Sequence, residues 1–264
     1  MRAVKRWLGW IGAGTLNGIA GLGRLSALSL EMLGIISSRR PRGRQTLNQL
    51  HFIGVRSIPV VVITGAFTGM VFAAQTYLQF HKVKMDTAVG AVVAVAMTRE
   101  LGPVLTALMV AGRVGAAIAA ELGTMRVTEQ IDALRALATD PIDFLVVPRF
   151  LAMTVAMPLL TGFSILMGIF SGYVISVYFY NIEGAYYVHN MERYLRAQDF
   201  YQGLIKAAFF GLAIIMISSY KGLHCKEGAE GVGRATTEAV VVSSITILIS
   251  NFFLTLFLGT LLPP

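Results

Sequence analysis

The sequence predicts an all-α protein that crosses a membrane several times. Of its 264 residues, 55% are hydrophobic and only 14% are charged, and the mean hydropathy is +0.68. Such values are typical of helical membrane proteins and not of soluble domains. The apolar runs are continuous, whereas the strands of outer-membrane barrels alternate apolar and polar residues. We therefore expect a bundle of transmembrane helices.

Residues 1–45 are predicted to form an N-terminal segment that precedes a transmembrane domain of residues 46–264. Trp7, Trp10 and nearby basic residues favour an amphipathic helix at the membrane interface, and a poorly ordered tail is the alternative. The net charge of +8 is located in residues 1–56. Because basic flanks stay in the cytoplasm, we expect a cytoplasmic N-terminus. Nucleic-acid binding is not expected beside so much apolar sequence.

Five apolar segments are each long enough to cross a hydrocarbon core of ~30 Å, which needs ~20 helical residues. They are residues 55–80, 88–120, 149–180, 203–221 and 238–261. Five spans then put the C-terminus on the outer side of the membrane. Small residues at four-residue spacing predict close helix contacts. They are Ala107, Ala111, Gly115 and Ala119 in span two, Gly65 and Gly69 in span one, and Gly168 and Gly172 in span three.

The second predicted span contains two charged residues at membrane depth, Arg99 and Glu100. Such charges cost several kcal/mol unless they face protein, water or a polar ligand. Arg99 can bind a phosphate with geometrically matched donors, while Glu100 can balance Arg99 or meet an amine. A structural ion pair between helices is the alternative. Further along the span, Arg113 is expected to snorkel or to pair with an acid such as Glu121.

A short cytoplasmic helix is predicted between spans two and three. Thr128 is expected to cap it and Pro141 to end it. Its apolar stripe consists of Val127, Ile131, Leu134 and Ala138, whereas Glu129, Asp132 and Arg135 lie off the stripe. The helix either docks into a groove of a soluble partner or lies on the membrane.

The loop at 181–202 is expected on the outer face. Tyrosines such as Tyr178 precede the loop, and others such as Tyr187 lie within it. The loop also carries charged residues that include Arg196 and Asp199. Aromatic residues suit the interfacial belt of a membrane. The loop is therefore interpreted either as part of this belt or as a docking surface for an outer partner.

The sequence lacks the residue patterns that are typical of several function classes. No stretch matches G-x-x-x-x-G-K-[ST], so the chain is not expected to bind ATP by that route. The four histidines show no metal-ligand spacing, and we expect no metal, cofactor or catalytic residue here. Two alternatives stay open: an ion-coupled secondary carrier with Arg99 and Glu100 as a relay, and an intramembrane enzyme acting on lipid. The chain lacks a visible inverted repeat for the first and a nucleophile–base pair for the second.

A set of dispersed motifs occurs in residues 65–70, 99–104, 111–113, 121–133, 140–141, 148–149 and 233–237. Through these motifs, residues from about 50 to 260 resemble the MlaE (YrbE) family, the permease subunits of MCE-associated phospholipid ABC transporters. The resemblance implies a homodimer in a bacterial inner membrane, with a role in outer-membrane lipid asymmetry. It also implies a separate cytoplasmic ATPase that binds ATP and Mg, a small accessory regulatory subunit on that ATPase, and an MCE-domain protein on the outer face.

The resemblance also implies site residues. The lipid site would lie between two copies of the chain, lined by the first span and by Arg99 and Glu100. On the first span, the residues expected to face lipid tails and glycerol are Phe72, Gln75, Leu78, Gln79 and Phe80. The helix between spans two and three would couple to the ATPase through Arg126, Glu129, Asp132, Arg135 and Asp140.

Overall fold

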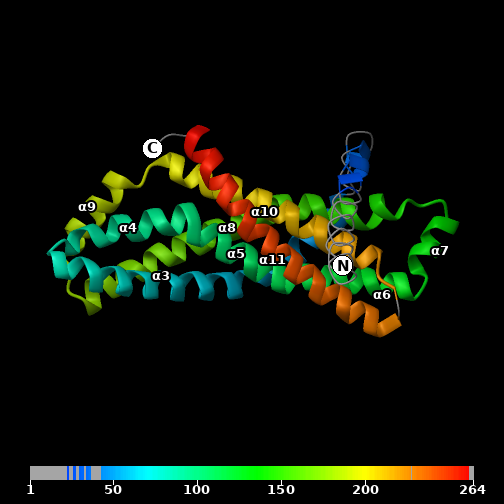
Figure 1. The fold of residues 1–264 in the computed structure, drawn as a ribbon, viewed down its shortest axis with the longest axis horizontal. Coiled ribbons are helices and arrows are strands. Elements are labelled where there is room, and N and C mark those ends of the chain that lie inside the picture. The colour runs from blue at the N-terminus through cyan, green and yellow to red at the C-terminus, as the bar shows by residue number, and fades with distance from the viewer. Residues whose placement is uncertain are drawn as a thin grey trace, which may run out of the picture.

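A computed structural model describes residues 23, 26–27, 30–32, 34–36, 43–226 and 228–261. Within these residues every regular element is a helix (Figure 1). Five helical spans are long and apolar enough to cross a membrane: Gly43–Val83, Asp86–Val127, Ile142–Phe179, Ala197–Leu223 and Gly228–Leu261. The predicted all-α fold with five spans is confirmed. The interfacial helix predicted in residues 1–45 falls mostly outside the described residues.

Each span is composed of the following helices. The first contains α2 (Gly43–Ile53) and α3 (Ile58–Phe80). The second contains α4 (Val89–Ala96), α5 (Gly102–Val110) and α6 (Ala116–Val127), separated by π-helical turns at Met97–Leu101 and Ala111–Gly115. The others are α8 (Val147–Val174), α10 (Ala197–Leu223) and α11 (Gly228–Leu261). Two short helices, α7 (Gln130–Ala136) and α9 (Gly184–Tyr194), lie between spans.

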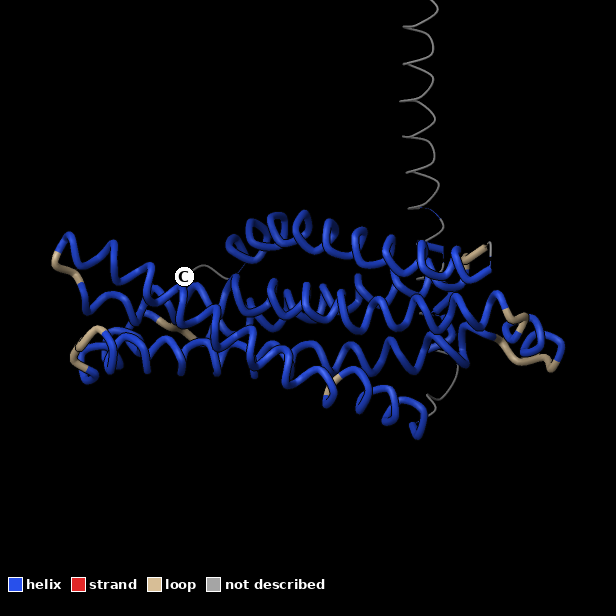
Figure 2. Tube along the Cα trace, turned by 90° about the horizontal axis from the view of Figure 1, so that it is seen from below, coloured by secondary structure: helices blue, strands red, loops and turns tan. Residues whose placement is uncertain are grey.

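The spans run lengthwise beside one another in an elongated bundle, with α7 at one end and α9 at the other (Figures 1 and 2). Helix α3 packs on α8, and α10 packs on α8, α6 and α11. Helix α11 crosses the face formed by α10 and α5 obliquely (Figure 1). The spans extend beyond the apolar segments read from the sequence because amphipathic ends such as α2 continue the same helices.

Small residues allow the first and third spans to approach closely, as predicted. A Cβ atom added to Gly65 would lie 2.7 Å from the carbonyl oxygen of Ser164, and one added to Gly69 would collide with the backbone of Gly168. Backbone contact of this kind is how helices associate in lipid, where burial from water does not drive packing. The small stripe of span two is also buried, and a Cβ on Gly115 would meet Ser218 and Ile214 of α10.

Helix α9 is anchored to α4 by one tyrosine. The Tyr187 side chain is completely buried, and a Cβ on Gly90 would lie 2.8 Å from the Tyr187 carbonyl oxygen. Burial raises the pKa of Tyr187 to about 12, and the neighbouring Ser176 offsets this increase in part. The phenol therefore stays neutral and holds α9 against the second span, where α9 helps to form the groove described below.

The helix between spans two and three starts and ends differently from the prediction. The Thr128 hydroxyl donates to the Thr124 carbonyl at 2.8 Å, so Thr128 does not cap α7. The N-cap position is Glu129, which has a positive φ of 60°. The helix ends at Ala136, before Pro141, because the chain turns at Ala138 with a positive φ of 53°. The α7 helix is therefore shorter than the sequence indicated.

Candidate functional site

Arg99 lies in the π-helical turn Met97–Leu101 of the second span. Its Nε donates to Oδ1 of Asp199 at 2.6 Å, and its Nη2 lies 2.5 Å from the same oxygen. Asp199 is completely buried in the first turn of α10. We expected Glu100 to balance Arg99 and Asp199 to lie in an outer loop. The structure instead places Asp199 inside the bundle as the partner of Arg99.

Glu100 pairs with Lys206 of α10. The Lys206 ammonium donates to Glu100 Oε1 at 2.7 Å, and its side chain is only 1% exposed. Two residues of α11 complete the shell: Asn251 donates to Oε2 of Glu100 at 2.9 Å, and the Thr255 hydroxyl lies 3.0 Å from Oε1. Glu100 therefore connects the second, fourth and fifth spans.

A proline explains a further contact of this network. Pro103 has no N–H to donate to the carbonyl four residues earlier, which is that of Arg99. The Lys206 ammonium donates to this carbonyl at 3.0 Å and to the Thr255 hydroxyl at 2.8 Å. With the bond to Glu100, all three ammonium protons have acceptors. This satisfies the requirement for burying a cation in an apolar bundle.

The charges cancel within each of the two ion pairs, but Arg99 remains accessible. Arg99 and Lys206 contribute two positive charges, which Asp199 and Glu100 balance. The side chains of Arg99 and Glu100 remain 32% and 37% exposed, whereas those of Asp199 and Lys206 are about 1% exposed. A ligand can therefore reach Arg99 and Glu100 from outside the bundle, while their partners stay covered. π-Helical turns occur frequently at such functional sites.

The accessible side of this network opens into a groove along α4. The groove has a volume of about 600 Å³ and ends at Arg99 and Glu100. Its walls are mainly apolar, with Met85 just before the second span and Ala88, Ala91, Val92, Val95 and Ala96 within it, and Thr87, Asn190 and Tyr194 add polar groups. A second pocket of about 420 Å³ shares Val95, Arg99 and Tyr194 with it and adds Arg193 and Arg196. This arrangement suits a ligand with an apolar chain and an anionic head.

The predicted residues of the first span do not line this groove in the single chain. Phe72 and Phe80 are half-buried and pack on a cluster that contains Val93 and Tyr187. Gln75, Leu78 and Gln79 are exposed on the outer side of α3. The assignment of these five residues to a lipid site stays a prediction.

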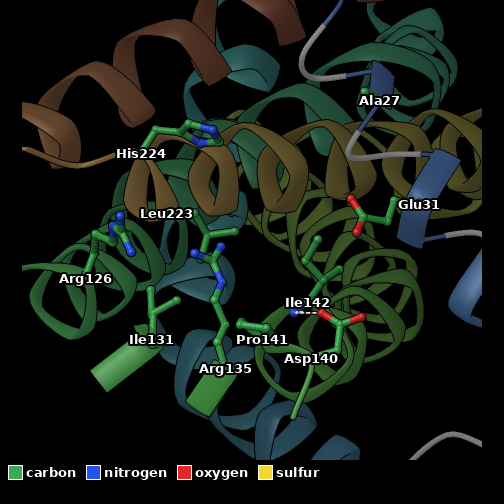
Figure 3. Close-up of a pocket in the computed structure, with 10 residues that line it drawn as sticks. All are labelled: Ala27, Glu31, Arg126, Ile131, Arg135, Asp140, Pro141, Ile142, Leu223 and His224. Atoms are coloured by element: carbon green, nitrogen blue, oxygen red, sulfur yellow. Dashed lines mark hydrogen bonds between the residues drawn. The ribbon is translucent and has the colours of Figure 1, made fainter. Parts of the chain in front are cut away.

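At the other end of the bundle, α7 carries a small ionic cluster. Asp132 accepts from Arg126 at 2.8 Å and from Arg135 at 3.3 Å. Figure 3 shows both arginines beside a cavity of about 460 Å³ that is also lined by Glu31 and Asp140. The Asp140 carboxylate accepts from the backbone N–H of Ile142 at 2.9 Å and so caps the start of the third span.

Of the residues predicted to couple to a partner, Arg126, Asp132, Arg135 and Asp140 therefore lie together around α7. Glu129 is exposed and precedes the helix with its positive φ. Their role in coupling stays a prediction.

Sequence reasoning missed four residues of the ionic network. They are Asp199 as a buried group, Lys206, Asn251 and Thr255. One signal for them was present: Lys206 interrupts the apolar fourth span as Arg99 and Glu100 interrupt the second. Opposite charges in separate transmembrane segments predict pairing between those segments.

The five spans, the embedded ionic network and the apolar groove define a multi-pass membrane protein of the permease class. Residues 46–257 match the family model described as Permease MlaE. This chain belongs to the MlaE permease family.

Relatives extend from bacteria to a plant chloroplast. A probable ABC transporter permease protein of Rickettsia conorii is 50% identical over 209 residues, covering 79% of this chain and 81% of that protein. The intermembrane phospholipid transport system permease protein MlaE of Haemophilus influenzae is 37% identical over 210 residues, covering 79% and 80%. The chloroplastic protein TRIGALACTOSYLDIACYLGLYCEROL 1 of Arabidopsis thaliana is 42% identical over 214 residues, covering 81% of this chain and 61% of that protein.

Proposed function

We propose that this chain is the transmembrane subunit of an ATP-driven transporter that moves phospholipid between the inner membrane and an MCE protein on the outer face. The observation that carries the proposal is the groove of about 600 Å³ that ends at the partly exposed Arg99 and Glu100. The printed name of the Haemophilus influenzae relative supports phospholipid as the cargo.

In this proposal the lipid phosphate competes with Asp199 for the guanidinium of Arg99. The planar guanidinium can donate two parallel hydrogen bonds to a phosphate. When the site is empty, Asp199 keeps Arg99 compensated and oriented. Lys206 neutralises the negative charge of Glu100, so that Glu100 does not repel the anionic phosphate. The apolar residues of α4 contact an acyl chain, and release of the lipid restores the pair between Arg99 and Asp199.

ATP and Mg would bind to a separate cytoplasmic ABC ATPase that docks on α7. The chemistry of Arg126, Glu129, Asp132, Arg135 and Asp140 suits a polar protein contact. Because α7 is joined by short turns to the second and third spans, a displacement of α7 would move both spans. A small accessory regulatory subunit would bind to the ATPase and not to this chain.

Two copies of the chain would form the transporter, with the N-termini in the cytoplasm and the C-termini in the periplasm. Exposed phenylalanines on α11, among them Phe252, Phe253 and Phe257, are more than half exposed in the single chain. Such a face suits contact with a second copy or with lipid tails. The exposed Gln75, Leu78 and Gln79 of the first span would then face the cavity between the two copies.

Mass spectrometry of proteins and lipids after mild detergent extraction tests this proposal. We expect a stoichiometric ABC ATPase, an MCE-domain protein and bound phospholipid to co-purify with the chain. Arg99→Ala is expected to lose the phospholipid while keeping the proteins, and Lys82→Ala, at an exposed position outside the groove, serves as the control. A chain that purifies without an ATPase and without lipid would favour an ion-coupled carrier instead.

A further inference from the structure

Two arginines from different spans lie close to a single aromatic ring at the α7 end of the bundle. The ring is that of Phe52, near the end of α2. Arg56 lies four residues later, and Arg113 belongs to the π-helical turn Ala111–Gly115 of the second span. Each guanidinium carbon lies 5.9 Å from the centroid of the Phe52 ring. This distance is within the range of a cation–π contact.

The positive charges of these arginines are not compensated by the described part of the chain. Arg113 Nη1 donates to the neutral hydroxyl of Ser57 at 2.5 Å, and that hydroxyl donates to the Ile53 carbonyl at 2.5 Å. No carboxylate among the described residues forms an ion pair with Arg56 or Arg113. The partner predicted for Arg113, Glu121, instead pairs with Arg149 at 2.8 Å.

The rest of the sequence offers almost no acid that could fill this role. Among the positions that the structure does not describe, Glu227 is the single acidic residue. In the sequence it lies between α10 and α11, whereas Phe52 and Arg56 belong to the first span. The two neighbouring cations can therefore accept an anion from another molecule. A membrane at this depth offers lipid phosphates.

The depth of the arginines matches that of lipid headgroups. Arg56 and Ser57 immediately precede α3, where the apolar part of the first span begins at Ile58. Arg113 lies fourteen residues after Arg99, which corresponds to roughly 21 Å along a helix toward α7. This separation is about two thirds of the thickness of a hydrocarbon core of ~30 Å. The site is therefore near the membrane surface at the α7 end, away from the groove at Arg99.

We propose that Arg56 and Arg113 form a binding site for the phosphate of an anionic phospholipid in the leaflet at the α7 end. The Phe52 ring and the Ser57 hydroxyl hold the guanidinium groups in place, and their free N–H groups donate to the phosphate. Bound lipid relieves the repulsion between the two cations. The proposal rests on the proposed function only in taking the α7 end as the cytoplasmic face, and this lipid is a bound component distinct from the cargo at Arg99.

A tryptophan at position 52 can report on lipid at this site. The chain contains two tryptophans, Trp7 and Trp10, so Trp7→Phe, Trp10→Phe and Phe52→Trp together create a single reporter that retains an aromatic ring. The full-length chain, separated from its co-purifying partners, is placed in phosphatidylcholine vesicles. Brominated phosphatidylglycerol or brominated phosphatidylcholine is then added at equal mole fractions, and quenching of the tryptophan fluorescence is measured.

We expect brominated phosphatidylglycerol to associate about thirtyfold more strongly than phosphatidylcholine, since each of the two arginines near an anionic lipid contributes about 1 kcal/mol. Arg56→Gln combined with Arg113→Gln should abolish this preference, and Lys82→Gln, at an exposed position at the opposite end, should keep it. Equal quenching by both lipids with the arginines intact would overturn the proposal. Inorganic phosphate at millimolar concentration should not displace the lipid, and displacement would assign the site to free phosphate.

Further measurements distinguish this site from the cargo site at Arg99 and from a docking surface for the ATPase. Arg99→Ala should lose lipid transport but keep the phosphatidylglycerol preference, so the two lipid sites can fail independently. A preference that disappears when the ATPase is bound would overturn the proposal in favour of protein docking. In the native Phe52 background, mass spectrometry should show retained phosphatidylglycerol, lost on Arg56→Gln with Arg113→Gln. Unchanged retention in that variant would contradict the site without reliance on the tryptophan.

Discussion

Arg99 pairs with Asp199, one hundred residues further along the chain, and not with the adjacent Glu100. Neighbouring residues on a helix do not face each other, so the two charges of the second span point to different partners. Asp199 pairs with Arg99 and Lys206 pairs with Glu100, and both partners belong to α10. This division leaves one face of Arg99 open to the groove while its charge stays compensated.

Asp199→Asn should increase phospholipid binding. The amide oxygen can still accept from the Arg196 backbone N–H, as Asp199 does at 2.9 Å, so the start of α10 is preserved. The charge that competes with a lipid phosphate is removed. Because a hydrogen bond to a charged group contributes about 1.5–3 kcal/mol, we expect bound lipid affinity to rise by about tenfold or more. Lipid phosphorus per purified chain measures this, with Glu183→Gln as the control. Unchanged or reduced lipid would contradict the competition.

Lys206→Met should destabilise the bundle strongly. It removes a lysine that is 1% exposed and leaves the Glu100 carboxylate, which is 37% exposed, without its cation. Because this carboxylate is partly solvated, we expect a loss of about 1.5–3 kcal/mol, the contribution of a hydrogen bond to a charged group. Glu100→Gln combined with Lys206→Met should recover much of the loss. Lys221→Met on the same helix is a matched control because its pair with Glu238 is more exposed, and it should cost less than about 1 kcal/mol. Thermal unfolding in detergent measures the loss of stability in each variant. Equal losses for both lysines would contradict the structural role of the Lys206–Glu100 pair.

Gly69→Ala should lower the unfolding temperature, although alanine usually stabilises a helix by about 0.5–1 kcal/mol relative to glycine. The added Cβ would collide with the Gly168 backbone and push α3 from α8. Gly162→Ala, also within a span, provides the control because nothing lies within 4 Å of its added Cβ. It should leave stability unchanged or raise it. If both variants behave alike, the close contact is not important for packing.

Asp132→Asn should impair coupling to the ATPase more than folding. The substitution releases Arg126 and Arg135, whose side chains are 35% and 63% exposed. Exposed pairs contribute at most about 1 kcal/mol, so the thermal stability should change little. We expect the amount of ATPase that co-purifies with the chain to fall by several-fold. Glu192→Gln on α9 is the control at the opposite end. Normal ATPase recovery with Asp132→Asn would argue against docking at α7.

The five spans and their small-residue contacts could be predicted from the sequence because both depend on local patterns. Apolar length identifies a span, and glycine spacing identifies a face such as that of Gly65 and Gly69. The ends of the spans were harder to predict. The amphipathic α2 extends the first span to Gly43, beyond the apolar run that marks the membrane-spanning part.

The partners of the buried charges were not predictable from local patterns. A sequence shows that Arg99 and Lys206 lie in apolar segments, but not which faces of those segments meet. The π-helical turns at Met97–Leu101 and Ala111–Gly115 also rotate later side chains relative to a regular helix. Arg113 and Glu121 are eight residues apart, roughly 12 Å along a helix, and each meets a residue of another span instead: Arg113 donates to Ser57, and Glu121 pairs with Arg149.

The most direct test of the central claim is ATP-dependent lipid transfer by the reconstituted complex. Proteoliposomes that contain this chain, its ATPase and isotopically labelled phospholipid would be mixed with the soluble part of the MCE protein, and label on each side would be followed over time. The account predicts transfer that requires ATP and falls by at least about tenfold with Arg99→Ala, a loss of about 1.4 kcal/mol or more. Transfer that proceeds equally without ATP, or with Arg99→Ala, would contradict it.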